Sequence, residues 1–531
     1  MATVREVSFD LFRNLGTTTI FGNPGSTELP MLADFPGDFR YVLGLHEAVV
    51  VGMADGYAQA SGRPSIANLH TAPGVGNAMG AIFNAQANHS PVVVTAGQQA
   101  RAQMTLQANL TNRDAIRMPH PLVKWSYEPP RAEDVPLALA RGIHMASLPP
   151  KGPVFVSIPM DDWDVEVEQA ATHALQRRVE GRAVAAPDSI GRLAAQLDEA
   201  SNPVMVAGPD IDASGGWDAA VGLAERQRLP VWATPAPGGG RLGFPENHPN
   251  FRGVLPPAIG PVGQTLEGHD LILVVGSSVF PYYPHIPGPL LPQGASLVAI
   301  TSDPDEAARA PMGNAILADP GLTLAALLEA VPESSRPAPE PNPGPSEIPA
   351  EDPLNSSTVH SALAEVLPED AIVVLESPAS TLALRNQLRL SQPGSYYFSA
   401  GGGLGFGLSG AVGVQLAQPD RPVVCVIGEG SVQYAVTAFW SAVAHDVPVT
   451  FLVMRNSEYA ILKWFAEVES VTGAPGLDLP ALDVAAVAAG YGVSTKVARD
   501  RDEVRAALAG ALASSKPELV EVPVQPGMSL F

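Results

Sequence analysis

Residues 423–465 read VVCVIGEGSVQYAVTAFWSAVAHDVPVTFLVMRNSEYAILKWF. The apolar runs Val423–Ile427 and Val447–Met454 predict two buried strands, because each is short, rich in β-branched residues and bounded by turn residues. Gly428-Glu429-Gly430 predicts a tight turn between the first strand and a helix that we expect from about Ser431 to His445. A strand, a helix and a second strand of this kind form a unit of an α/β fold with a parallel sheet.

The glycine turn in this stretch is the first candidate site. A turn of this kind at a helix N-terminus is typical of pockets for anions and for the metal ions that accompany them. Glu429 in the turn and Asn456 after the second strand offer hard oxygen ligands. Parallel strands place both residues at the carboxyl edge of one sheet, where α/β proteins bind ligands. The stretch therefore predicts one half of a site for an anionic cofactor and its metal.

Composition limits the classes of function. The chain has 531 residues, 46% of them hydrophobic and 16% charged, which predicts several domains with large cores. The net charge of −23 argues against binding to nucleic acid or to anionic membranes, and no apolar run is long enough for a transmembrane helix. The single cysteine, Cys425, lies in an apolar strand and is expected to be a buried structural thiol. The N-terminus does not resemble a signal peptide, so we expect a cytoplasmic protein.

Strands and helices alternate along most of the chain, which predicts three α/β domains with doubly wound parallel sheets. We place these domains at residues 1–182, 183–332 and 357–531. The intervening segment, residues 333–356, is rich in proline and in acidic residues and predicts an extended linker. Two strands of the middle domain end in glycine, at 207–209 (AGP) and 276–278 (GSS), but neither forms a G-x-G-x-x-G motif. We therefore favour a structural role for that domain over nucleotide or flavin binding.

Three polar residues of the first domain are candidates for chemistry. Ser26 lies in a turn cluster after the expected strand Thr19–Phe21, where a bare turn is the alternative. Glu47 begins a helix among apolar residues; it is either a buried acid that can share a proton or a first-turn glutamate stabilised by the helix dipole. His70 ends the expected strand Ser65–His70 before a glycine-rich loop, and is either an acid–base group or a structural histidine.

Taken together, these motifs resemble those of thiamin diphosphate-dependent 2-keto acid decarboxylases. FGNPGS at 21–26, HEAVVVGMADGYA at 46–58 and LHTAPGVGNAMGA at 69–81 are similar to the pyrimidine-binding domain of that family. GEGS at 428–431 with RN at 455–456 is similar to its diphosphate-binding domain. Within the family, the chain resembles the benzoylformate decarboxylases over nearly its whole length. The resemblance implies a pyrimidine-binding domain, a central Rossmann-like domain and a diphosphate-binding domain.

The resemblance also implies roles for single residues. Glu47 would hydrogen-bond the aminopyrimidine ring of thiamin diphosphate held by a neighbouring subunit, and would assist loss of the thiazolium C2 proton. Ser26 and His70 would hold the substrate carboxylate and relay protons. The cofactor-binding set would be Glu47, Ser377, Ser380, Thr381, Gly402, Leu404, Gly428, Glu429, Gly430, Ser431, Asn456 and Tyr459. The ligands of Mg²⁺ or Ca²⁺ would be Glu429, Asn456 and the backbone carbonyl of Glu458. The substrate pocket would be formed by Asn23, Pro24, Gly25, Leu110, Ile461, Leu462 and Phe465.

The chain departs from the family pattern at several positions. Glu429 stands where the family has aspartate, and its extra methylene moves the carboxylate by roughly 1.5 Å, against a tolerance of about 0.2 Å in metal sites. Arg455 replaces an asparagine and is expected to pair with Glu429 or with an exposed carboxylate. Tyr283 replaces a second histidine that protonates the reaction intermediate in the relatives, and His285 follows two residues later; a proline-rich surface loop is the alternative reading. Ile461 replaces a smaller alanine and is expected to narrow the pocket.

These observations leave three functions open. The first is decarboxylation of an aromatic or branched 2-keto acid to an aldehyde and CO₂. The second is a thiamin-dependent carboligase or lyase acting on 2-hydroxyketones, which the missing second histidine favours. The third is a cofactor-binding paralog with low turnover and a structural or sensing role, against which the retained Ser26, Glu47 and His70 argue. The family further implies a homodimer at minimum, and a homotetramer as a dimer of dimers.

Overall fold

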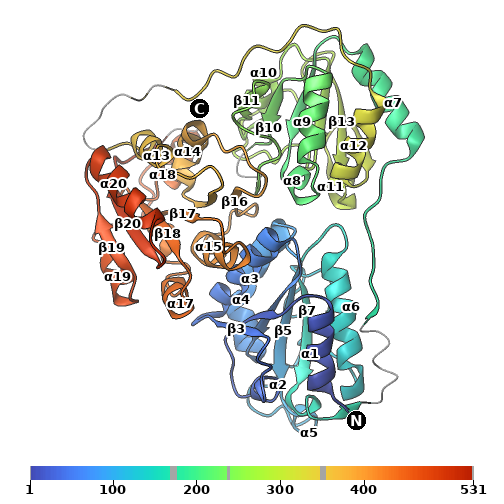
Figure 1. Ribbon diagram of the computed structural model, residues 1–531, viewed down its shortest axis with the longest axis vertical. Helices are drawn as coiled ribbons and strands as arrows, with labels where there is room; N and C mark the ends of the chain where they lie inside the picture. Colours follow the sequence, from blue (N-terminus) through green and yellow to red (C-terminus); the bar gives the residue numbers. More distant parts are fainter. Residues whose placement is uncertain (1, 168–175, 236–239, 347, 349–353, 529–531) are drawn as a thin grey trace.

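The computed structural model describes residues 2–167, 176–235, 240–346, 348 and 354–528. These residues form three α/β domains, each built on a six-stranded parallel sheet between layers of helices (Figure 1). The prediction of three parallel-sheet domains is confirmed, while the boundaries at residues 182, 332 and 356 stay predictions. Part of the expected linker, residues 347 and 349–353, lies outside the described residues. None of the described helices is long and apolar enough to cross a membrane.

The N-terminal domain has the strand order β3-β2-β4-β5-β7-β6. Its strands are β2 (Thr19–Gly22), β3 (Arg40–Leu43), β4 (Ser65–Leu69), β5 (Val92–Gln98), β6 (Ser126–Tyr127) and β7 (Val154–Pro159), and the short strands β1 (Ala2–Thr3) and β8 (Glu166–Val167) pair separately. Its helices are α1 (Val4–Asn14), α2 (Leu29–Leu32), α3 (Glu47–Ser61), α4 (Thr71–Ala87), α5 (Arg101–Met104) and α6 (Val135–Ser147), with 3₁₀ turns at Ala132–Asp134 and Met160–Asp162. The expected strand Ser65–His70 ends one residue earlier, because His70 is the N-cap residue of α4.

The central domain has the strand order β11-β10-β9-β12-β13-β14. Its strands are β9 (Pro203–Ala207), β10 (Val231–Ala233), β11 (Phe251–Val254), β12 (Leu271–Val275), β13 (Ser296–Thr301) and β14 (Asn314–Leu317). Its helices are α7 (Pro187–Glu199), α8 (Pro209–Ala213), α9 (Trp217–Arg226), α10 (Ile259–Thr265), α11 (Pro304–Arg309) and α12 (Pro320–Ala330). In order of sequence this is the 3-2-1-4-5-6 arrangement of a Rossmann fold, with the order reversing between β9 and β12.

The C-terminal domain has the strand order β16-β15-β17-β18-β20-β19. Its strands are β15 (Ile372–Glu376), β16 (Tyr396–Phe398), β17 (Val423–Gly428), β18 (Val449–Arg455), β19 (Ser494–Val497) and β20 (Glu518–Pro523). Its helices are α13 (Ser356–Ala364), α14 (Thr381–Leu388), α15 (Phe406–Ala417), α16 (Glu429–Val432), α17 (Ala438–Ala444), α18 (Ala460–Val468), α19 (Val484–Gly490) and α20 (Arg501–Leu512), with a 3₁₀ turn at Pro378–Ser380. Cys425 is fully buried in β17, as expected of a structural thiol.

The single helix expected from Ser431 to His445 is wrong. The segment forms the short helix α16, a turn, and then α17. Within the turn, the amides of Tyr434 and Ala435 donate to carbonyls three residues earlier, so the backbone follows a 3₁₀ path. The β-branched pair Val436-Thr437 has low helix propensity and lies where the α-helical pattern stops.

The N- and C-terminal domains share one hydrophobic core across the contact between α3 and α15 (Figure 1). Glycine allows this contact: a Cβ on Gly56 would lie 2.2 Å from the carbonyl oxygen of Gly410, and one on Gly413 would lie 1.9 Å from that of Met53. The helix that begins with Glu47 is therefore fixed against the domain that carries Glu429.

Candidate active site

His70 and Glu28 form a pair at the carboxyl edge of the N-terminal sheet. His70 follows the last residue of β4, and Glu28 lies in the loop after β2, the neighbouring strand. Nδ1 of His70 lies 2.9 Å from Oε2 of Glu28, whose side chain is only 1% exposed. Ser26 lies two residues before Glu28 and is exposed. The fold thus brings Ser26 and His70 to the same edge, as predicted. It also places the carboxylate of Glu28 beside His70.

The other partners of Glu28 fix the tautomer of His70. The carboxylate accepts hydrogen bonds from the amides of Gly25 (2.7 Å) and Gly97 (2.8 Å) and from the Thr27 hydroxyl (2.7 Å). Because a carboxylate accepts from all these donors, Nδ1 of His70 donates to it, and Nε2 is free to exchange a proton. Gly25 is required, since a Cβ there would lie 2.2 Å from His70 Nδ1.

Glu28→Gln is expected to reduce turnover without loss of cofactor binding. The glutamine side chain would place an N–H₂ group against donors that now bind the Glu28 carboxylate. His70 would then lose the acceptor that orients its ring. We expect kcat for the substrate to fall on the order of 10-fold to 100-fold, as when other residues that orient a reacting group are replaced. Steady-state kinetics and a titration of cofactor affinity measure the two effects. Equal loss of both would indicate that Glu28 only supports the fold.

Glu47 is the first residue of α3 and is almost buried, with 8% of its surface exposed. Helix α3 is started by His46, whose Nδ1 accepts from the amide of Ala48. The Glu47 carboxylate accepts one hydrogen bond, 3.0 Å from Nδ2 of Asn77, and its other oxygen packs near Gly74. A nearly buried carboxylate with one side-chain donor retains capacity for a ligand hydrogen bond.

The glycine-rich loop before α15 is open on one side and anchored on the other. Gly402 has a φ of 69°, is exposed, and has no atom within 4 Å of an added Cβ. The Gly403 carbonyl accepts from Nδ2 of Asn84 at 3.0 Å, which ties the loop to α4, and Leu404 is half-buried. Glu376 at the end of β15 holds the start of α15 through the amide of Gly405 at 2.8 Å. Burial raises the pKa of Glu376 to about 7 although backbone amides favour its ionised form.

Glu429 and Asn456 lie at the carboxyl ends of adjacent strands, as predicted. Strands β17 and β18 pair in register up to Gly428 and Met454, so the residues that follow meet at one edge. The Glu429 side chain is 2% exposed and accepts from the Ser457 amide at 2.5 Å. Its longer side chain therefore reaches across to the loop after β18. Burial raises the pKa of Glu429, partly offset by hydrogen bonds from backbone amides.

Arg455 pairs with a buried carboxylate, so the expectation that it would pair with Glu429 or with an exposed carboxylate is wrong. Its Nε donates to Oε1 of Glu521 at 2.7 Å, and the Glu521 side chain is 4% exposed. Because Arg455 and Glu521 lie on the neighbouring strands β18 and β20, the pair is set by sheet register. The guanidinium is bonded to Glu521, and its charge still favours the ionised form of Glu429 and so lowers the pKa of that group.

The remaining predicted cofactor residues lie around the same edge. Ser377, Ser380 and Thr381 are buried after β15, and the Ser380 hydroxyl donates to that of Ser377 at 2.9 Å. Gly430 leaves no room for a side chain, because a Cβ would lie 2.6 Å from the Tyr459 ring. Gly428 is the N-cap residue of α16, and Ser431 is buried inside it. Glu458, the expected backbone ligand, carries a side chain that bonds Lys463 and the Gly527 amide (2.6 Å).

Helix α18 and the central domain meet at the expected substrate pocket. The Tyr283 ring lies 4.7 Å from the Phe465 ring, with 40° between the planes. Tyr283 is 61% exposed and His285 is also exposed. Ile461 is half-buried, whereas Leu462 is 46% exposed. Tyr283 rather than His285 therefore contacts a predicted pocket residue.

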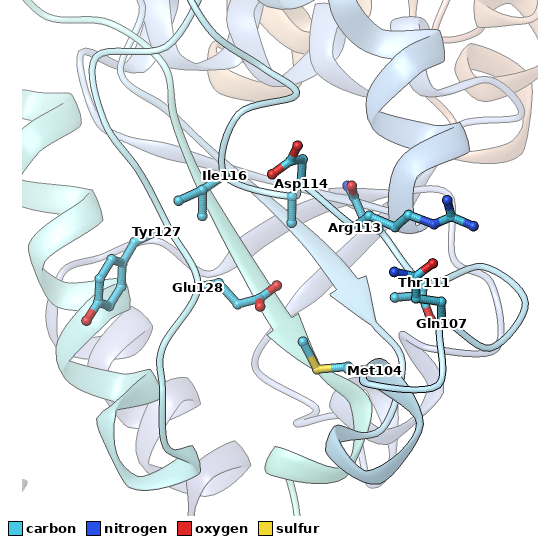
Figure 2. A pocket seen from close by; sticks show the side chains of 10 residues that line it. Met104, Gln107, Thr111, Arg113, Asp114, Ile116, Tyr127 and Glu128 are labelled. Carbon is cyan, nitrogen blue, oxygen red and sulfur yellow. The ribbon is translucent and has the colours of Figure 1, made fainter.

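The other predicted pocket residues lie on two loops of the N-terminal domain. Asn23, Pro24 and Gly25 are half-buried after β2. Leu110 is half-buried with a φ of 68° and lies in the loop that borders a cavity of about 400 Å³. Figure 2 shows the side chains of Asp114 and Glu128 among those around this cavity.

Three family models match the chain in order. They are the N-terminal TPP binding domain, the central domain and the C-terminal TPP binding domain of thiamine pyrophosphate enzymes, at residues 2–118, 190–327 and 379–522. The chain belongs to the thiamine pyrophosphate enzyme family. Its two cofactor-binding domains are thus the domains that carry Glu47 and Glu429.

Within the thiamine pyrophosphate enzymes, the chain is similar to decarboxylases. It is 52% identical to benzoylformate decarboxylase of Pseudomonas aeruginosa over 99% of both chains. Its fold matches the Rhodococcus jostii thiamine diphosphate-dependent 4-hydroxybenzoylformate decarboxylase at a TM-score of 0.96 and 46% identity. Benzoylformate decarboxylase from Polynucleobacter necessarius matches at 0.97 and 39% identity. Each of the two structures and this chain cover each other fully.

The residues of this chain fit thiamin diphosphate. The exposed Gly402, the nearly buried Glu47 and the Glu429–Asn456 edge offer an acceptor, an acid and oxygen ligands in the two TPP-binding domains. Sequence reasoning missed Glu28 and Asn77, which hold His70 and Glu47. Glu28 had a visible signal, since it stands two residues after the FGNPGS turn. Asn77 is recognisable only once α3 and α4 are packed together.

Proposed function

We propose that the protein is a thiamin diphosphate-dependent decarboxylase of aromatic or branched 2-keto acids. The reaction breaks the bond between the keto carbon and the carboxylate carbon, releases CO₂, and adds a proton to the former keto carbon to give an aldehyde. The observation that carries the proposal is the His70–Glu28 pair beside Ser26 on a chain 52% identical to a benzoylformate decarboxylase. Thiamin diphosphate supplies the nucleophile and the electron sink when it is bound.

The chain's own residues divide the remaining work. Ser26 binds the substrate carboxylate, and Nε2 of His70 holds and returns a proton, because its Nδ1 is committed to Glu28. Glu47 meets the pyrimidine ring of the cofactor. Phe465 with Tyr283 forms an aromatic wall, which suits an aryl substrate and keeps water from the leaving carboxylate.

A panel of 2-keto acids tests the function and the pocket. We expect kcat/KM to be highest for benzoylformate or a branched 2-keto acid. We expect Ile461→Ala to shift the ratio of kcat/KM values toward larger aryl groups by about 10-fold, the discrimination that one or two methylenes give in an apolar pocket. Val468→Ala, at an exposed position of the same helix outside the expected pocket, is the matched control. If Ile461→Ala leaves the ranking unchanged, Ile461 does not line the pocket.

Carboligation is the second candidate function. The exposed Tyr283 stands in place of the second histidine, and a phenol is a weaker acid than an imidazolium at neutral pH. Slower protonation would leave more time for an aldehyde to add. Formation of 2-hydroxyketones from benzoylformate and an added aldehyde measures this activity, and Tyr283→His is expected to lower it relative to aldehyde release.

Mg²⁺ would be held by the Glu429 carboxylate, the Asn456 amide oxygen and the Glu458 carbonyl. We expect chelation to release the cofactor, and Glu429→Gln to weaken Mg²⁺-dependent cofactor binding about 10-fold or more, because a charged oxygen ligand is lost. Since burial raises the pKa of Glu429, protonation competes with the metal, and cofactor retention should fall as the pH is lowered. Glu458→Gln is the control, because only its backbone is proposed as a ligand. Cofactor that stays bound after exhaustive chelation would rule out this metal site.

A homodimer at minimum, and a homotetramer as a dimer of dimers, would complete the sites. Large apolar side chains are exposed beside the site residues, at Leu29, Leu45, Tyr434 and Leu462, and such surfaces mark protein contacts. A location in the cytoplasm remains part of the proposal.

A further inference from the structure

A large cavity lies between the N-terminal and central domains. It has a volume of about 940 Å³ and is lined by residues of both domains, among them His89, Asp210 and Glu306. Its central-domain wall is the carboxyl edge of the sheet at the point where the strand order reverses, between β9 and β12. Rossmann folds bind ligands at this point. None of the residues assigned to the thiamin site lines it.

His89 reaches from the N-terminal domain toward carboxylates of the central domain. It follows the C-cap residue of α4 and adopts a φ of 52°. Its Nδ1 lies 3.6 Å from Oδ1 of Asp210, and its Nε2 lies 3.7 Å from Oδ2 of Asp303. Both separations are longer than a hydrogen bond, so the His89 ring lies close to the two carboxylates without a direct hydrogen bond to either.

The carboxylates are held in place by their own domain. Oδ1 of Asp303 caps α11 by accepting from the amides of Asp305 (2.7 Å) and Glu306 (3.3 Å), which leaves Oδ2 directed at His89. Oε2 of Glu306 accepts from the Thr301 hydroxyl at 2.8 Å. Ligand atoms of His89, Asp303 and Glu306 all lie within 4.8 Å of one another. One imidazole and two carboxylates thus converge on a space at the cavity edge.

Three carboxylates, those of Asp210, Asp303 and Glu306, lie around His89. Glu306 also has a long ion pair of 3.7 Å with Arg309, and the charge of Lys124 acts on Asp303. Arg241, whose charge acts on Asp210, is paired with Asp212 at 2.8 Å.

We propose that Nε2 of His89, Asp303 and Glu306 bind a zinc ion that joins the N-terminal and central domains. One nitrogen and two carboxylate oxygens with an open fourth position for water form a tetrahedral set that suits Zn²⁺. With Nε2 on the metal, Nδ1–H would face Oδ1 of Asp210, now 3.6 Å away, and a small movement would form the hydrogen bond that carboxylates make behind zinc-bound histidines. The cavity gives the ion a route to the site.

Zinc stoichiometry tests this site independently of the decarboxylase. Holoenzyme saturated with thiamin diphosphate and Mg²⁺ is dialysed against micromolar Zn²⁺, and bound zinc is counted by atomic emission. We expect His89→Gln to hold one zinc per chain fewer than the wild type. Asp303→Asn, which keeps an oxygen to cap α11, should lose the same ion. His248→Gln is the matched control, because among the described residues Glu225, at 3.3 Å, is the one carboxylate paired with His248.

Two results would overturn the proposal. One is equal zinc content in wild type, His89→Gln and Asp303→Asn. The other is the same loss in His248→Gln, which would place the zinc elsewhere. Zinc should also raise the midpoint of thermal unfolding in the wild type and leave the midpoint of Asp303→Asn unchanged. Because neither variant touches the thiamin site, failure of the decarboxylase assay would leave these results unaffected.

Discussion

Glu47→Gln is expected to lower decarboxylation by about 10²-fold to 10⁴-fold while leaving the fold intact, since this is the contribution of a positioned acid or base. The carboxylate is 8% exposed, stands at the start of α3 and has one side-chain donor, Asn77. Glutamine keeps the shape and can still accept from Asn77, but it cannot carry the proton that the pyrimidine ring exchanges. The loss should therefore fall on kcat, and the thermal midpoint should change little.

A matched control for this variant is Glu6→Gln. Glu6 is also a first-turn glutamate, in α1, but it is exposed and serves only the capping box with Thr3. Steady-state kinetics of both variants, with thiamin diphosphate and Mg²⁺ saturating, measure the difference. Unchanged turnover in Glu47→Gln would show that another group performs the proton transfer.

Arg385→Met is expected to destabilise the protein by about 3–5 kcal/mol, the usual effect of removing one partner of a buried ion pair. Arg385 in α14 and Glu246 of the central domain have side chains only 5% and 1% exposed, and Arg385 Nη2 lies 2.6 Å from Glu246 Oε1. Glu246 also accepts from the Leu390 amide at 3.2 Å. Without the guanidinium, a buried carboxylate would remain unpaired between two domains.

Arg309→Met is the control for this effect. Its pairs with Asp305, at 3.1 Å, and with Glu306, at 3.7 Å, leave the guanidinium side chain 58% exposed. Such pairs contribute about 0–1 kcal/mol. Urea unfolding followed by circular dichroism compares the two variants. If they lose equal stability, the Glu246–Arg385 pair does not hold the central and C-terminal domains together.

Local sequence patterns predicted those parts of the fold that local chemistry determines. The start of α3 at Glu47 was predicted correctly, because an apolar helical run begins there. The division of residues 431–445 into two helices was not predicted. The sequence there is apolar enough for one helix, and the turn depends on packing. The edge strands β11 and β14 were also missed, since short strands carry little periodicity.

The candidate site was predictable where a single local motif determines which residue follows a strand. Glu429, Asn456 and His70 follow strands, so topology brings each to a sheet edge. The pairing of Arg455 with Glu521 depends on which strand lies next to β18, and residues 66 positions apart give no local sign of it. The chain's departures from its family therefore become interpretable only in the folded sheet: Glu429 reaches Ser457, and Arg455 is neutralised elsewhere.

The most direct test of the decarboxylase proposal is the stoichiometry of products from benzoylformate. The holoenzyme is incubated with this substrate alone, and CO₂ and benzaldehyde are quantified together, with Glu47→Gln as the inactive reference. We predict one CO₂ and one aldehyde for each keto acid consumed, and almost none with the variant. Absence of CO₂ release from benzoylformate and from branched 2-keto acids, in protein shown to hold the cofactor, would contradict the proposal.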